Sequence, residues 1–361
     1  MINRKKCPFC GKLFVGQKRN FEHVIPKWLV TEADLKSRQM EVNLESGPLS
    51  VGMNSIGSKA CATCNSKYAK LEDLAKIVFF KIRDGADLHS DDIDIFLDWL
   101  DKIRIGLWLW GLDISKQSSN VNPKFRIENR IGLKDRIVAI AKYPPGEAGK
   151  GLEFWGVTST FFSTPCSFGF FANNIAIITI SYEFLLLQHR LNLSVPLVIH
   201  AQDAEESILR GGDIMAQFEL SVPLKERLRL VGSPRVYGQI IVSEAVGDAY
   251  LPMEAKQHAR RSGYRVTKPY SLNDNLEIVD FEASGIEVTE NINKITLMEM
   301  NVHRAEEYIV RTFLQSDFSK IRNALSSRAT LERFHQNLFL ERVAIENLKE
   351  FYYRQTGIIV T

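Results

Sequence analysis

Four of the five cysteines stand in two pairs with a spacing that is typical of metal ligands. Cys7 and Cys10 form CPFC, and Cys61 and Cys64 form CATC. Two intervening residues let one short turn present both sulfurs to a single ion, and two such turns complete a tetrahedral zinc site. Four thiolates fill the coordination sphere of zinc, so we expect a structural ion that does not catalyse.

A second candidate for chemistry is the pair Glu22-His23 in FEHVIPKW, residues 21–28. A carboxylate is a hard ligand for a divalent cation, and an imidazole with a pKa near 6.5 can accept a proton at neutral pH. Neighbours on a regular strand point to opposite faces, so the two share a site only where the strand ends or twists. Pro26 fits such an ending. Alone, a pair of this kind is usually an ordinary surface pair.

The surrounding segments give the pair a context. CPFCGKLF, FEHVIPKW and KACATCNSKYAKLED together resemble HNH endonucleases of the zinc-stabilised ββα-metal type, over about residues 5–84. The resemblance implies an enzyme that hydrolyses phosphodiester bonds of nucleic acid, with DNA as the expected substrate. It implies structural Zn²⁺ and a catalytic divalent ion, Mg²⁺ or Mn²⁺.

The same resemblance assigns roles to individual residues. Glu22 and Asn65 are expected to ligate the catalytic ion, and His23 is expected to take a proton from the attacking water. Asn65 also has a plain structural alternative as a helix N-cap, a position that favours Asn.

One position departs from the family pattern. The residue that usually orients the base falls here on Ile56. Asn54, two residues earlier, is the nearest candidate for that role, and Ser55 or Ser58 are alternatives. The glycine- and serine-rich segment 43–60 is expected to form a long loop.

Positive charge is concentrated at the N-terminal end. Residues 1–84 carry 15 Lys and Arg against 8 Asp and Glu, whereas the remainder carries 31 against 35. A basic segment on a near-neutral body favours a polyanionic partner, although a solvated basic surface is an alternative. We expect Phe21 and Trp28 to be packing residues, and the alternative is that they stack on bases. The lysines expected to contact phosphates are Lys27, Lys59, Lys67 and Lys70.

Periodicity predicts the elements that position these residues. Apolar residues at helical spacing predict amphipathic helices, and short runs rich in β-branched and aromatic residues between about 124 and 245 predict strands. The predicted helices are 65–84, 89–110, 181–191, 296–314 and 329–355. The predicted strands are 125–131, 136–143, 152–160, 174–181, 195–201 and 240–245. A polar loop is predicted at 115–123.

The expected fold class is α+β. An N-terminal ββα-metal (HNH) unit with a four-cysteine zinc site precedes a mixed, mostly antiparallel β body with a helical C-terminal part. We place the domains at 1–84, 85–290 and 291–361. The second and third carry no motif that names a ligand.

Composition limits the class of protein. Apolar residues make up 45% and charged residues 25%, as in soluble globular proteins. The longest apolar run, 105–112, is far shorter than the roughly 20 residues of a membrane span. We expect a cytoplasmic protein with no membrane partner.

Two functions follow as hypotheses. The first is a metal-dependent HNH endonuclease whose C-terminal body controls it, as in defence effectors. The second is a non-catalytic zinc-binding module with a degenerate HNH site that contacts nucleic acid or protein. A homodimer and a regulatory protein partner both stay open.

Overall fold

The computed structural model describes most of the first 144 residues and shorter parts of the remainder. The described residues are 6–14, 19–34, 39–44, 47–114, 127–129, 131–132, 134–144, 151–155, 166–182, 195–196, 215–216, 235–243, 258–261, 264–272, 278–279, 281, 283–288, 300, 302–304, 307 and 328–357. Within these ranges no helix combines the length and the apolar character needed to cross a bilayer.

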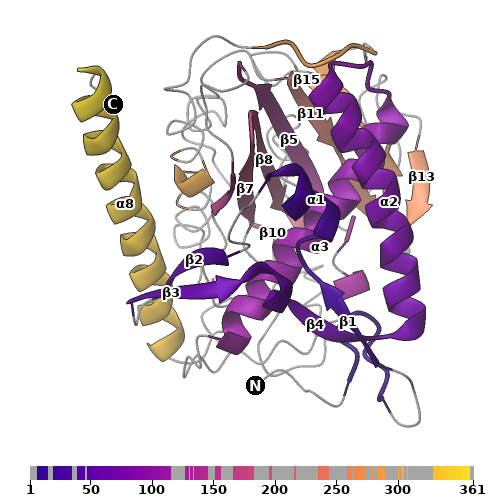
Figure 1. Ribbon diagram of the computed structural model, residues 1–361, viewed down its shortest axis with the longest axis horizontal. Helices are drawn as coiled ribbons and strands as arrows, with labels where there is room; N and C mark the ends of the chain where they lie inside the picture. The colour runs from indigo at the N-terminus through magenta and orange to yellow at the C-terminus, as the bar shows by residue number, and fades with distance from the viewer. Residues whose placement is uncertain are drawn as a thin grey trace.

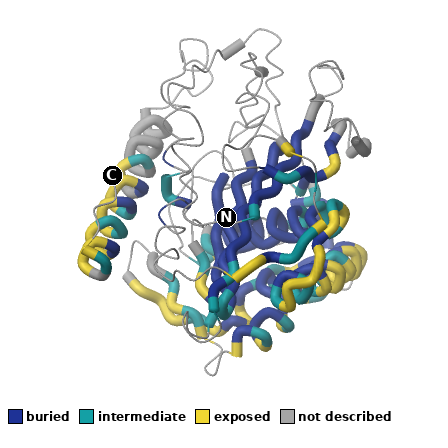
Figure 2. The backbone as a smooth tube through the Cα atoms, turned by 90° about the horizontal axis from the view of Figure 1, so that it is seen from above, coloured by how far each residue is buried: buried dark blue, intermediate teal, exposed yellow. Residues whose placement is uncertain are grey.

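An antiparallel sheet lies at the centre of the described structure (Figure 1). Its strands are β5 (Asp135–Lys142), β6 (Leu152–Trp155), β7 (Ser167–Ala172), β8 (Ile175–Tyr182), β11 (Arg235–Gln239), β15 (Tyr270–Leu272) and β16 (Ile278–Val279). They follow the order β16-β15-β11-β5-β8-β7-β6. Strand β7 is buried along its whole length, and nearly all described residues of β5 and β8 are buried too, whereas β6 at the edge of the sheet is partly exposed. The tube of Figure 2 is accordingly dark in the middle of the sheet, so both faces are covered there.

Two long helices follow one another beside this sheet. They are α2 (Ala62–Asp84) and α3 (Ser90–Ile114). Helix α2 ends at Gly85, whose φ of 72° is the left-handed conformation that glycine adopts readily. Helix α3 starts with two acidic residues in its first turn, where they complement the helix dipole. It lies across one face of the sheet, and α2 runs beside it (Figure 1).

The N-terminal part is built on a pair of antiparallel strands that leads directly into α2. The pair consists of β1 (Arg19–His23) and β4 (Gly57–Cys61). The elements between them are α1 (Lys27–Glu32), β2 (Gln39–Leu44), β3 (Gly47–Gly52) and the 3₁₀ turn η1 (Met53–Ser55). Among the described strands, β2 and β3 pair only with each other.

Aromatic rings join the N-terminal part to the sheet through α3. The rings of Trp28 and Trp99 are stacked with centroids 5.6 Å apart, and Trp99 meets Phe170 edge-on at 6.0 Å. These residues belong to α1, α3 and β7, so one apolar core connects all three elements. The predicted domain boundary at residue 84 falls between two helices that share this core, and it stays a prediction.

The remaining described elements lie around this centre. Two residues of helix α8, Ile345 and Tyr352, pack with Met300 in a small separate core. The helix lies at the side of the molecule away from α2, and its outer side is exposed (Figures 1 and 2). The elements are β9 (Val195–Pro196), β10 (Met215–Ala216), β12 (Ile241–Ser243), β13 (His258–Arg261), β14 (Tyr264–Thr267) and α8 (Arg328–Thr356).

Several sequence expectations are confirmed. The fold is a mixture of helices and antiparallel sheet, with a four-cysteine cluster near the N-terminus. The predicted helices 65–84, 89–110 and 329–355 correspond to α2, α3 and α8. The described parts of 136–143 and 174–181 are strands. Residues 115–123, 183–191 and most of 296–314 lie outside the described residues.

Two expectations are wrong. The described middle of the predicted strand 125–131 is a 3₁₀ turn, η2 (Ile127–Asn129), whose backbone donates hydrogen bonds to the first cysteine turn. Ile127 N–H donates to the carbonyl of Pro8 at 2.9 Å. The predicted loop 43–60 is also ordered, since it contains β3, η1 and β4.

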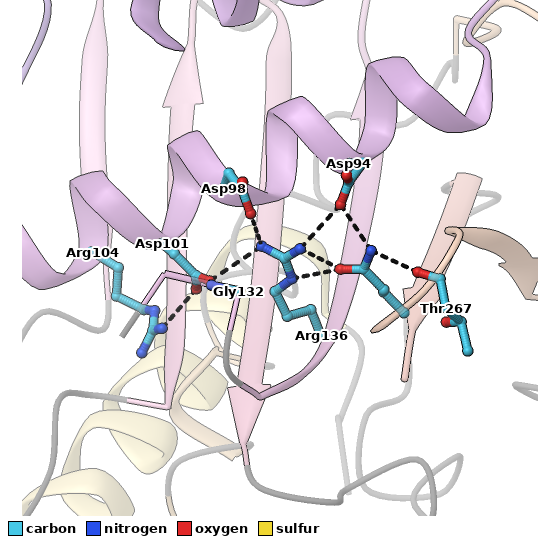
Figure 3. A network of polar contacts seen from close by, with 8 residues as sticks. Asp94, Asp98, Asp101, Arg104, Gly132, Arg136 and Thr267 are labelled. Carbon is cyan, nitrogen blue, oxygen red and sulfur yellow. Dashed lines mark hydrogen bonds and ion pairs between the residues drawn. The ribbon is translucent and has the colours of Figure 1, made fainter. Parts of the chain in front are cut away.

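A fully buried arginine links α3 to the sheet (Figure 3). Arg136, on β5, is 0% exposed and forms ion pairs with Asp98 at 2.7 Å and with Asp94 and Asp101 at 3.3 Å. Its Nε also donates to the side-chain oxygen of Gln239, on β11, at 2.9 Å. A buried charge is tolerated only when it is paired and hydrogen-bonded, and here three acids from successive turns of α3 surround one guanidinium.

The partners of this arginine are themselves held in place. Asp101 pairs with Arg104 at 2.7 Å and accepts the backbone N–H of Gly132 at 3.0 Å. Burial acts to raise the pKa of Asp101, but Arg104 and Arg136 together keep that pKa below its ordinary value. Gln239 donates to Asp94 and to the carbonyl of Thr267. The network therefore ties α3 to β5, β11 and the end of β14.

Replacement of the central arginine should destabilise the whole described fold. Arg136→Ala removes the buried guanidinium that pairs with three carboxylates of α3 and leaves its place in the core unfilled, and removal of one member of a buried ion-pair group costs about 3 to 5 kcal/mol. We expect that loss in urea unfolding at pH 7. Lys268→Ala removes an exposed contact to Asp91 and serves as the matched control, with little expected change. Equal stability of the two variants would contradict a central role for Arg136.

Candidate functional site

The four paired cysteines converge at the junction of β4 and α2. Cys61 is the last residue of β4, and Cys64 lies in the first turn of α2. Cys7 and Cys10 lie in a turn in which Gly11 N–H donates to the carbonyl of Cys7, and Gly11 has a φ of 71°. All four side chains are buried, and their sulfurs lie within 4.8 Å of one another.

The geometry fits a tetrahedral metal ion. The sulfurs of Cys10 and Cys61 are 3.8 Å apart, and a zinc ion with bonds of about 2.3 Å places its four sulfurs about 3.8 Å from one another. The backbone N–H of Cys61 points to the sulfur of Cys7 at 3.4 Å, which is the hydrogen bond a thiolate ligand accepts. The cysteine cluster can therefore hold zinc, as the sequence predicts.

Burial explains why this cluster needs a cation. Desolvation raises the pKa of Cys7 and Cys64, so both thiols would stay protonated at neutral pH. Zinc binding releases the thiol protons, and the two positive charges of the ion offset half of the charge of four thiolates. Around the cluster, the rings of Phe9 and Tyr68 lie 4.5 Å apart, and Trp108 of α3 belongs to the same apolar group.

The β1–β4 pair, called the ribbon below, has two different faces. Residues directly opposite in an antiparallel pair point to the same side. The inner face is formed by Asn20, Glu22, Ser58 and Ala60, and the outer face by Arg19, Phe21, His23, Gly57, Lys59 and, at its end, Cys61. Glu22 and Ala60 are buried, whereas the residues of the outer face other than Cys61 are exposed or half-buried. The predicted pair Glu22-His23 is therefore split between the two sides.

On the inner face, Glu22 is part of an ion-pair group that joins three elements. Its Oε1 lies 2.5 Å from Nζ of Lys102, on α3. The same ammonium contacts the carboxylate of Glu72, on α2. Lys102 is 2% exposed, so two carboxylates offset the desolvation of one buried ammonium. Burial raises the pKa of Glu72, and Lys102 opposes that shift.

This arrangement does not fit a divalent cation at Glu22 as it stands. The carboxylate predicted to bind Mg²⁺ or Mn²⁺ is the counter-ion of Lys102, and a metal would have to displace that ammonium. In the described part of the chain, the only group of three or more converging His, Cys or acidic ligands is the cysteine cluster.

On the outer face, His23 stands at the end of β1. Its ring centroid lies 5.0 Å from that of Phe21, with the ring planes at 80°. Burial lowers the pKa of His23, and the ammonium groups of Lys27 and Lys102 lower it further, while Glu22 opposes them. The imidazole is therefore neutral at pH 7 and can accept a proton.

The other predicted catalytic residues, Asn54 and Asn65, are distant from His23 in the sequence. Asn65 is half-buried in the first turn of α2, and Asn54 is exposed in η1. Ile56 is fully buried, and its carbonyl accepts the N–H of Val24 at 2.9 Å. Between described residues, no hydrogen bond or ion pair joins His23 to either asparagine.

The four predicted lysines lie on three elements. Lys27 opens α1, Lys59 lies on the outer face of the ribbon, and Lys67 and Lys70 lie on α2. Lys67 is placed 3.8 Å from the carboxylate of Glu128, which partly neutralises it. All four lysines are exposed.

Sequence reasoning missed Lys102 and Glu72. Glu72 stands seven residues after Asn65, two helical turns along the same side of α2. Lys102 stands in the sequence within one turn of Asp98, Asp101 and Arg104, so its charge alone did not mark it as a buried residue. Its partners are 80 and 30 residues away, and only the fold reveals them.

Zinc content tests the cysteine cluster. We expect the purified chain to contain one zinc ion, and Cys64→Ser to lose it and to melt at a lower temperature, because three thiolates hold the ion less tightly. Cys166→Ser is the matched control, since Cys166 is buried outside the cluster. Metal analysis and thermal melting measure both. A zinc-free parent, or equal zinc loss in the control, would refute the site.

The environment of His23 predicts its titration. We expect its pKa to lie below the value of about 6.5 found in model peptides, because burial and two ammonium groups disfavour the imidazolium. Lys27→Met should raise the pKa, whereas Lys349→Met, on α8, should leave it unchanged. NMR titration of the imidazole C–H signals measures this. A pKa of His23 above the peptide value would show that the described surroundings are wrong.

Comparison with known proteins gives no relative to guide these assignments. The chain matches no protein-family model, no curated protein and no solved structure.

Proposed function

We propose that the N-terminal part binds nucleic acid and hydrolyses its phosphodiester bonds, as an HNH-type endonuclease does. One observation carries the proposal. A two-stranded ribbon leads through a four-cysteine cluster into α2, with His23 at the end of the first strand. That histidine shares the exposed face with Arg19 and Lys59.

The chemistry assigns a step to each of these groups. Neutral His23 takes a proton from a water molecule, whose oxygen then bonds to phosphorus while the bond to the leaving sugar oxygen breaks. Arg19, Lys59 and Lys27 neutralise the phosphates of the bound strand. The zinc in the cysteine cluster holds the end of β4 against α2 and takes no part in the reaction.

A second function is favoured by a different observation. Glu22 is buried and engaged by Lys102, which leaves the inner face of the ribbon without a free carboxylate for a catalytic metal. In this second candidate the unit binds nucleic acid through its outer face and does not cleave. Control by residues 85–361, a role in defence and the oligomeric state stay predictions that no described residue tests.

A cleavage assay separates the two candidates. We expect the zinc-loaded full chain to nick plasmid DNA when Mg²⁺ or Mn²⁺ is added, and His23→Ala to reduce the rate about 10²- to 10⁴-fold, as loss of a general base does. His89→Ala removes an exposed histidine just before α3 and is the matched control. Gel electrophoresis with DNA and RNA substrates measures the rates.

Two results would count against the first candidate. Equal rates for His23→Ala and its control would remove His23 as the base. Binding of DNA or RNA without cleavage, in a chain that holds its zinc, would select the non-catalytic module.

A further inference from the structure

Phe21 is an aromatic side chain that the packing of the protein leaves in solvent. It is 46% exposed, and the other strongly exposed aromatic side chains among the described residues lie on α8. The prediction that Phe21 is a packing residue is therefore inaccurate, whereas Trp28 does pack, against Trp99 and Phe79.

One side of the exposed ring rests on the ribbon. Gly57 lies across the ribbon, and a Cβ atom at Gly57 would stand 2.4 Å from the carbonyl oxygen of Glu22 and 2.5 Å from the ring of Phe21. Glycine thus leaves room both for the close approach of the strands and for the ring. His23 contacts the ring edge-on from the same strand. Phe21 therefore presents an aromatic surface to solvent while Gly57 and His23 support the ring.

The charges around this ring are positive. Lys59 is directly opposite Phe21 in the strand register, and Arg19 precedes it on the same face. The guanidinium of Arg19 lies 5.0 Å from the ring centroid of Phe14, so that side chain also has a defined position. The nearest acid in the ribbon, Glu22, points to the inner face and pairs with Lys102.

From this face we infer a specific ligand: we propose that the ribbon binds an unpaired nucleotide, with the base stacked on Phe21 and the adjoining phosphates at Lys59 and Arg19. The bases of an intact duplex cover one another, so an exposed ring can stack only on a base in a single strand, a loop or a bulge. The inference rests on the nucleic-acid binding in the proposed function and does not require cleavage.

Binding measurements test the proposal independently of catalysis. The zinc-loaded full chain, without added divalent ion, is titrated against fluorescein-labelled single-stranded DNA, single-stranded RNA and matched duplex DNA, and gels confirm that the strands stay intact. We expect Phe21→Leu to weaken single-strand binding about 5- to 150-fold, the range that loss of one stacked base produces. Phe21→Trp should keep the affinity. Phe351→Leu, with 50% exposure on α8, is the matched control.

Salt dependence tests the cationic half of the surface. Lys59→Gln should reduce the slope of log affinity against log salt by about 0.7 for a single strand, as loss of one phosphate contact does.

The fluorescence of a base analogue tests stacking directly. A single strand carrying 2-aminopurine should show a fluorescence change on binding to the parent and to Phe21→Trp, and a smaller change with Phe21→Leu.

The outcomes are distinguishable from those of the cleavage assay. Equal affinity of Phe21→Leu and Phe351→Leu, with zinc retained, would overturn the inference even in a chain that cuts DNA. Tighter binding of the matched duplex than of the single strand would also overturn it. If binding depends on Phe21 but the chain never cuts nucleic acid, the inference is upheld and the proposed nuclease activity is refuted. If Phe21→Leu loses zinc or melts at a lower temperature than the parent, the Phe21→Trp variant decides instead. Weak single-strand binding by a folded Phe21→Trp would overturn the stacking role.

Discussion

A guanidinium that has no contact with water sets the arrangement of the described fold. Arg136 is fully buried on β5, and its charge is acceptable there only because Asp94, Asp98 and Asp101 face it from α3. The helix cannot rotate or slide without separating these charges. The position of α3 over the sheet is therefore fixed more strictly than apolar packing alone would fix it.

Helix α3 carries a second buried charge on another side. Lys102 follows Asp101 in the chain, but it points to the ribbon and to α2, where Glu22 and Glu72 receive it. One helix thus connects the sheet to the inner face of the ribbon through two ionic groups. The outer face carries His23, Arg19 and Lys59. It belongs to a ribbon whose inner face is joined to α3 by the ion pair of Glu22 and Lys102.

The sequence predicts local features of the site well because their signals are local. The cysteine pairs are recognised by their spacing, and α2 and α3 by their apolar period. The two faces of the ribbon were not predictable in the same way, because they depend on the register that places His23 opposite Gly57. A shift of one residue would exchange Glu22 and His23 between solvent and core. Exposure of Phe21 and pairing of Lys102 follow from that register and from contacts distant in sequence.

The prediction of a strand at 125–131 is wrong for a related reason. Its residues have strand-like composition, but backbone partners decide whether such a segment joins a sheet. Here the first cysteine turn supplies those partners, at Pro8 and Phe9. The four-cysteine cluster was predictable from sequence, whereas the segment that packs against it was not.

The cysteine cluster also acts on the unfolded chain. A metal bound there joins Cys10 to Cys61, 51 residues apart, and closing a loop of that size removes chain entropy worth about 4 kcal/mol at 25 °C in the cross-link estimate. Each doubling of the length of such a loop changes the entropic cost of closing it by only about 0.6 kcal/mol. The β2–β3 hairpin lies inside this loop and, among the strands that the structure describes, pairs with no other strand. A change of chain length at this hairpin would therefore leave the pairing of the ribbon intact.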